Sequence, residues 1–150
     1  MIRRIAREMA LQSLFEVDIL ESVRTSLPEA EGIDYTDFTV EAALGAAFAQ
    51  HEEEEALKAQ DFAETLVRGV LAHREELDAK LQQYSKDWSI ERMPAADRSI
   101  LRIAAYELFF AKHVQQPAVA INEAVELSKL YGTDDSPRFV NGVLGKLVEK

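Results

Sequence analysis

Three arginines open a chain whose formal net charge is −10. Arg3, Arg4 and Arg7 fall within the first two helical turns, and Phe15 lies along the same edge of that helix, about 16 Å further on. Guanidinium groups bind phosphates and aromatic rings stack on bases, so this combination is typical of proteins that bind single-stranded nucleic acid. Because cations at a helix N-terminus oppose the helix dipole, the arginines are expected to serve another purpose than helix stability. We expect their side chains to avoid the core.

The last predicted helix carries a second candidate surface. Four residues share one of its faces, opposite an apolar face: Arg138, Asn141, Gly142 and Gly145. The stretch VNGVL at 140–144 echoes VRGVL at 67–71. A glycine costs a helix about 1 kcal/mol relative to alanine, so Gly69, Gly142 and Gly145 are expected to permit close approach of another backbone. That backbone would belong to a neighbouring helix, a protein partner or a nucleic acid.

Catalytic and metal-binding patterns are missing from the sequence. His51, His73 and His113 lack ligand spacing, and the common phosphate-binding, zinc-binding and nucleophile motifs are absent. Asp134 and Asp135 precede a predicted helix start, where capping is their ordinary role. There is no cysteine, which excludes disulfides and fits a reducing cytoplasm. We therefore expect no enzyme activity, no metal and no cofactor.

Helical spacing of apolar residues predicts an all-α fold. Seven helices are expected, at about 2–20, 39–50, 58–71, 74–86, 95–112, 118–131 and 137–148. The helix at 95–112 is apolar almost all round, so it is predicted to be central and buried. Ser136 and Pro137 are expected as N-cap and first residue of the last helix. With 150 residues and short connections in its second half, the chain is predicted to form one compact bundle.

The acidity of the chain is concentrated in one segment. Residues 28–61 carry ten acids and a single base, Lys58, for a net charge of −9, while the other residues sum to −1. Electrostatic potentials act within a Debye length of about 8–10 Å, so this segment does not exclude nucleic-acid binding elsewhere. No apolar run approaches the roughly 18 residues of a membrane span, and no signal peptide is expected.

Five stretches together resemble the NusB family of bacterial transcription antitermination factors. They are RRIAREMALQSLFEVD at 3–18, VRGVLAHREELD at 67–78, DRSILRIAAYEL at 97–108, INEAVELSKLYG at 121–132 and RFVNGVLGKL at 138–147. Their order and spacing make the likeness specific. The resemblance implies one all-helical domain over residues 1–150, with two small subdomains at about 1–73 and 74–150.

The resemblance also implies a function in transcription. Members of the family bind the single-stranded boxA element of ribosomal and other antiterminated RNA together with NusE, a small-subunit ribosomal protein. The complex, with other Nus factors, helps RNA polymerase to read through terminators. A cytoplasmic location without membrane association is implied, and the free protein is expected as a monomer or a homodimer.

Site residues follow from the matched stretches. The resemblance places seven residues on the RNA side: Arg3, Arg4, Arg7, Phe15, Asp135, Arg138 and Phe139. Phe15 stands where the family often has tyrosine, so a stacking ring is kept and a hydroxyl contact is lost. Asp97, at the head of the 95–112 helix, is implied to face the protein partner. Two departures from the family pattern are Ile5, at a position of another arginine in some members, and Pro137, in a usually proline-free loop.

Two other interpretations compete with the RNA-binding one. In the first, the helix edge that carries Arg3, Arg4 and Arg7 is an ordinary solvated face, and Phe15 lies partly in the core. The chain as a whole is also consistent with a helical protein–protein adaptor whose arginines bind an acidic partner. Binding to boxA-like and scrambled RNA, with and without NusE, separates the adaptor from the antitermination factor.

Overall fold

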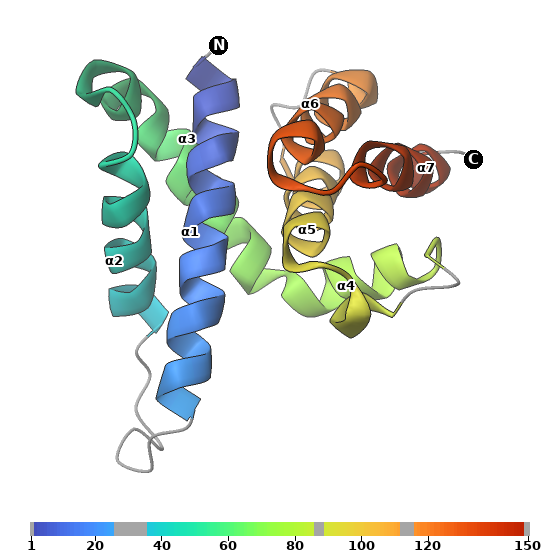
Figure 1. Ribbon diagram of the computed structural model, residues 1–150, viewed down its shortest axis with the longest axis horizontal. Coiled ribbons are helices and arrows are strands. Elements are labelled where there is room, and N and C mark those ends of the chain that lie inside the picture. Colours follow the sequence, from blue (N-terminus) through green and yellow to red (C-terminus); the bar gives the residue numbers. More distant parts are fainter. Residues whose placement is uncertain (1, 26–35, 86–88, 112–115, 149–150) are drawn as a thin grey trace. The chain divides into compact units, whose positions relative to one another are not determined.

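The computed structural model describes residues 2–25, 36–85, 89–111 and 116–148, and these ranges are helical (Figure 1). The helices are α1 (Ile2–Thr25), α2 (Thr36–Phe48), α3 (Glu53–Ala72), α4 (Arg74–Gln82), the short 3-10 helix η2 (Ile90–Arg92), α5 (Ala95–Phe109), α6 (Pro117–Tyr131) and α7 (Ser136–Val148). The ranges include no strand, which confirms the predicted all-α class. None of their helices combines the length and hydropathy that a membrane span requires.

The helix bounds depart from the predicted ones where polar residues begin a helix. α3 begins at Glu53, five residues before the predicted start, with three carboxylates in its first turn. Carboxylates are favoured there by the helix dipole, a contribution that apolar spacing does not reveal. α7 begins at Ser136 itself, and the Ser136 Oγ accepts a 2.8 Å hydrogen bond from the Thr133 N–H. Ser136 therefore stabilises the turn before α7, in place of the predicted N-cap role.

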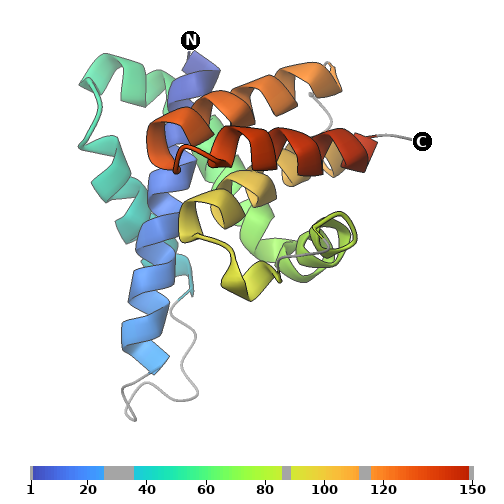
Figure 2. The ribbon, with the colours of Figure 1, turned by 45° about the vertical axis from the view of Figure 1, so that its right-hand side comes forward.

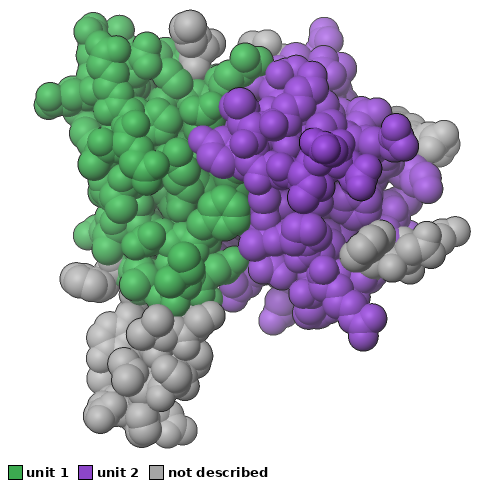
Figure 3. Space-filling view, viewed as in Figure 1, with its two compact units in different colours: residues 1–68 green, residues 69–150 purple. Residues whose placement is uncertain are grey.

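Contacts between helices divide the chain into two compact units, residues 1–68 and 69–150, with the division inside α3 (Figure 3). Unit 1 consists of α1, α2 and most of α3. Small side chains dominate its core, so the helices approach one another closely. The core residues are Ala6, Met9, Ala47, Ala56, Ala59 and Ala63, with Ile2, Ile5, Leu44, Phe48 and Phe62 packed against them.

Unit 2 is built around α5, which contacts α4, α6 and α7. The α6 and α7 helices run side by side (Figure 2). More than half of the α5 side chains are buried: Asp97, Ser99, Ile100, Leu101, Ile103, Ala104, Ala105 and Glu107. The central position predicted for this helix is thus confirmed within unit 2, although two of its buried residues carry carboxylates.

The glycines of the two echoing stretches have opposite surroundings. A Cβ on Gly69 would overlap the ring of Tyr106, so Gly69 permits the close approach of a side chain, not of a backbone as predicted. A Cβ on Gly142 or Gly145 would meet nothing within 4 Å. Among the described residues, no neighbouring helix therefore approaches these two glycines, and close approach of a protein partner or a nucleic acid stays a prediction.

Candidate nucleic-acid interface

The first candidate surface lies at the start of α1, in unit 1. Arg3 and Arg4 are exposed. The Cζ atoms of Arg3 and Arg7 lie 4.9 and 5.7 Å from the centre of the Phe62 ring, which belongs to α3. The face of an aromatic ring attracts a guanidinium group, so Phe62 holds both cations near one point. We call Arg3, Arg4, Arg7 and Phe62 the arginine end of α1.

Arg7 does not avoid the core, contrary to the prediction. Its exposed fraction is 5%, and Leu11, one turn further on, is fully buried. Neither Arg4 nor Arg7 is without a partner in the structure. The apolar spacing of α1 identifies its most apolar face, but it does not show how far other helices cover the neighbouring faces. An arginine tolerates such burial because its aliphatic stem packs against apolar groups.

Phe15 lies further along α1 and is half buried. Its ring is therefore neither sealed in the core nor fully presented to solvent. The exposed part of the ring is compatible with stacking on a base. The role of Phe15 on the RNA side stays a prediction.

The second candidate surface is a pocket of about 410 Å³ in unit 2. It is lined by Met93, Pro94, Asp97, Thr133, Asp135, Ser136, Arg138 and Phe139, and we call it the Asp97 pocket. The start of α5 supplies Asp97, whereas Asp135, Arg138 and Phe139 come from the start of α7 and the residue before it. Packing of α5 against α7 thus brings together all four unit 2 residues that the family resemblance implies for binding.

Asp97 is the most unusual group in this pocket. Its exposed fraction is 4%, and its Oδ1 atom has no hydrogen-bond partner among the described residues. A buried polar atom without a partner costs about 1–3 kcal/mol, and charged groups cost more. Around it the pocket offers the cation of Arg138, the carboxylate of Asp135 and the half-buried ring of Phe139. A ligand that donates a hydrogen bond to Asp97 Oδ1 would remove this cost.

Sequence reasoning missed several residues of both surfaces. Phe62 is distant in sequence from the arginines that it contacts, so no helical spacing could connect them. Met93 and Pro94 directly precede α5, and their nearness to Asp97 was a usable signal. Thr133, in the turn before α7, and Ser136, the first residue of α7, are joined by a hydrogen bond and form a wall of the pocket. Across the described ranges, no group of three or more histidine or acidic side chains is arranged to hold a metal ion.

Comparisons with known proteins find similar sequences and similar structures. The model of the NusB family matches residues 4–149. The transcription antitermination protein NusB of Symbiobacterium thermophilum is 45% identical over 149 residues, which cover 99% of this chain and 90% of that protein. The structure of NusB from T. maritima has a TM-score of 0.76 at 30% identity, covering 97% of this chain and 89% of that chain. A complex of the antitermination factors NusB and NusE with double-stranded RNA contains the same fold, with a TM-score of 0.71 at 24% identity over 97% of this chain and 95% of that one.

Proposed function

The chain belongs to the NusB family of transcription antitermination proteins, and we propose that it binds single-stranded boxA RNA together with NusE. Bound to both, and with other Nus factors, it helps RNA polymerase to read through terminators, notably in ribosomal RNA operons. The observation that most supports this proposal is the Asp97 pocket, in which Asp97 meets Asp135, Arg138 and Phe139. The family resemblance implies a binding role for all four, although only three of them are neighbours in the sequence.

At the arginine end of α1, exposed side chains supply the phosphate contacts. Arg3 and Arg4 extend from the first helical turn, and the Phe62 ring supports Arg3 from below. Arg7 is buried, so it adds to the local positive potential and to packing without a full phosphate contact. Phe15 offers the exposed part of its ring for stacking on a base.

In the Asp97 pocket, different residues serve RNA and protein. Arg138 binds a phosphate and the Phe139 ring stacks on a base. Asp135 is exposed and accepts a hydrogen bond from a base amino group, since a carboxylate repels phosphate. NusE supplies the N–H donor that Asp97 Oδ1 lacks among the described residues. Protein and RNA then bind next to each other, at one pocket.

The number of available cations predicts weak binding to RNA by the chain alone. Three to five phosphate contacts on a single strand give a slope of roughly −2 to −3.5 for the logarithm of the binding constant against the logarithm of salt concentration. A shared surface with NusE adds contacts without a larger basic patch on this acidic chain. The affinity should therefore depend strongly on both salt and NusE.

A fluorescence anisotropy titration tests the proposal. Labelled boxA RNA and a scrambled RNA of the same length are titrated with the chain, alone and with saturating NusE. We expect a preference for boxA that becomes larger when NusE is present. Equal weak affinity for both RNAs, unchanged by NusE, would overturn the proposal and would favour the protein–protein adaptor.

A further inference from the structure

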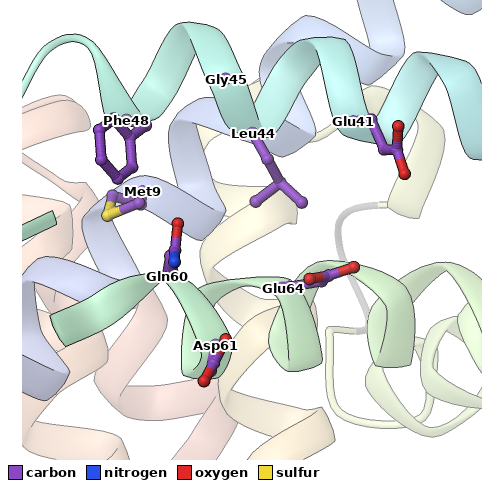
Figure 4. A pocket seen from close by; sticks show the side chains of 8 residues that line it. All are labelled: Met9, Glu41, Leu44, Gly45, Phe48, Gln60, Asp61 and Glu64. Atoms are coloured by element: carbon purple, nitrogen blue, oxygen red, sulfur yellow. The ribbon is translucent and has the colours of Figure 1, made fainter. Parts of the chain in front are cut away.

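The acidic part of unit 1 contains a groove whose lining residues are not among those assigned above to RNA binding. It has a volume of about 450 Å³ and lies between α2 and α3, with α1 behind it (Figure 4). Its lining residues are Met9, Glu41, Leu44, Gly45, Phe48, Gln60, Asp61 and Glu64. We call it the α2–α3 groove. Two of its carboxylates belong to the strongly acidic segment of residues 28–61.

The groove has an apolar floor and an acidic rim. Leu44 and Phe48 are half buried on the α2 side, and Figure 4 shows Leu44 pointing from α2 into the space above α3. The rim carries Glu41, Asp61 and Glu64, and no lining residue is basic. Glu64 is paired with Arg68 at 2.8 Å. Glu41 and Asp61 are exposed, so their negative charge is accessible to a ligand.

Two further features extend the apolar surface and keep the groove open. Leu57 is 53% exposed and lies one helical turn before Asp61, on the same side of α3. Gly45 opens into the groove, where a Cβ would meet nothing within 4 Å. Glycine weakens a helix, and here no neighbouring side chain accounts for it. The open space at Gly45 allows another element to approach the backbone of α2.

We propose that the α2–α3 groove binds a cationic amphipathic helix of a protein partner. Apolar side chains of such a helix, spaced one turn apart, would cover Leu44, Phe48 and Leu57, while its lysines or arginines would pair with Glu41 and Asp61. RNA is disfavoured, because its phosphates would face the carboxylates of the rim, where no lining residue is basic. A second copy of a chain with a net charge of −10 is disfavoured for the same reason. None of the residues that line the groove is among those we assign to boxA or NusE binding.

The test uses a fluorescein-labelled peptide of about 16 residues, built from leucine, lysine and alanine, with the leucines on one helical face and the lysines beside them. A peptide of the same composition in scrambled order measures attraction by charge alone. The full chain should bind the amphipathic peptide more tightly than the scrambled one. NMR shift changes should centre on Leu44, Phe48 and Asp61.

Variants of the chain locate the peptide. Gly45→Leu places its Cβ in open space and extends a side chain into the groove, so it should weaken binding of the amphipathic peptide roughly tenfold. Ala46→Leu is the matched control, since it adds a leucine at an exposed position of α2 outside the groove. Charge reversal by Glu41→Lys with Asp61→Lys should give a loss at least as large as Gly45→Leu and keeps the proposal testable if Gly45→Leu does not fold. Unchanged affinity in both groove variants would overturn the proposal, as would a dimer of the free chain that Gly45→Leu dissociates.

Discussion

The arginine end of α1 and the Asp97 pocket differ in whether their charged groups already have partners. Arg3 and Arg7 lie 4.9 and 5.7 Å from the centre of the Phe62 ring, so contacts within unit 1 hold these cations. In unit 2, the Oδ1 atom of Asp97 is buried and has no hydrogen-bond partner among the residues described. The arginine end of α1 therefore acts through its charge, and its affinity for RNA should fall gradually as single cations are removed. The Asp97 pocket depends on one hydrogen-bond donor from NusE, so its affinity for NusE should fall strongly when the Asp97 side chain is changed.

The largest expected effect is on the Asp97 pocket. Asp97→Asn keeps the shape of the side chain and removes its charge, and it should weaken NusE binding about a hundredfold, because the donor from NusE loses its charged acceptor. The free protein should melt at the same or a higher temperature, since the substitution removes the charge of a buried side chain whose Oδ1 atom has no hydrogen-bond partner among the described residues. Calorimetric titration with NusE and thermal denaturation measure the two effects.

A matched carboxylate serves as the control for this variant. Glu91 is exposed in η2, close in sequence to Asp97, and does not line the pocket. Glu91→Gln should leave both NusE affinity and stability unchanged. If Asp97→Asn bound NusE as tightly as Glu91→Gln does, the proposed difference between the two surfaces would be lost.

The second prediction concerns the exposed cations of α1. Arg3→Ala with Arg4→Ala should weaken boxA binding roughly tenfold and make the salt slope shallower by about 1.4, because two phosphate contacts are lost. Helicity should not change. Lys58→Ala with Lys129→Ala removes the same charge at exposed positions elsewhere and is the control. Equal losses in the two double variants would show that net charge, not this surface, sets the affinity.

Arg7 separates the structural from the binding contribution of the arginines. Because its side chain is 5% exposed, Arg7→Ala should lower the free energy of unfolding by about 1 kcal/mol through lost packing. Arg3→Ala, at an exposed position, should change it much less. Urea denaturation of the two variants measures this difference. Equal stability would mean that Arg7 packs no better than its exposed neighbour.

The smallest expected effect is at Phe62. Phe62→Leu keeps an apolar side chain but removes the ring below Arg3, so boxA affinity should fall roughly threefold. Phe62→Tyr keeps the ring and should bind RNA like the unsubstituted protein. Anisotropy titrations of both variants at low salt measure the effect. A loss in Phe62→Tyr equal to that in Phe62→Leu would argue against a contribution of the ring.

Apolar spacing predicts where the helices lie in the sequence, but it does not predict which helices pack against one another. The stretches VRGVL at 67–71 and VNGVL at 140–144 show this most clearly. The ring of Tyr106 lies against Gly69, whereas the position of a Cβ on Gly142 is open. Local sequence is nearly the same at the two glycines, so the difference comes entirely from which helices pack nearby.

The sequence predicts only part of each candidate surface. Helical spacing places Asp135, Arg138 and Phe139 near one another, but it gives no reason to add Asp97, which came from the family resemblance. Their meeting in one pocket depends on how α5 and α7 pack. The contact of Phe62 with the arginines depends in the same way on the packing of α3 in unit 1. Neither contact is encoded in the periodicity of a single helix.

The affinity of Asp97→Asn for boxA RNA, with and without NusE, shows whether Asp97 acts through the protein partner. We expect this variant alone to bind the RNA as the unsubstituted protein does, and saturating NusE no longer to strengthen the binding. An RNA affinity that still rises fully with NusE would mean that Asp97 is not needed for NusE to act. An equal loss of RNA affinity with and without NusE would mean that Asp97 binds the RNA and not NusE.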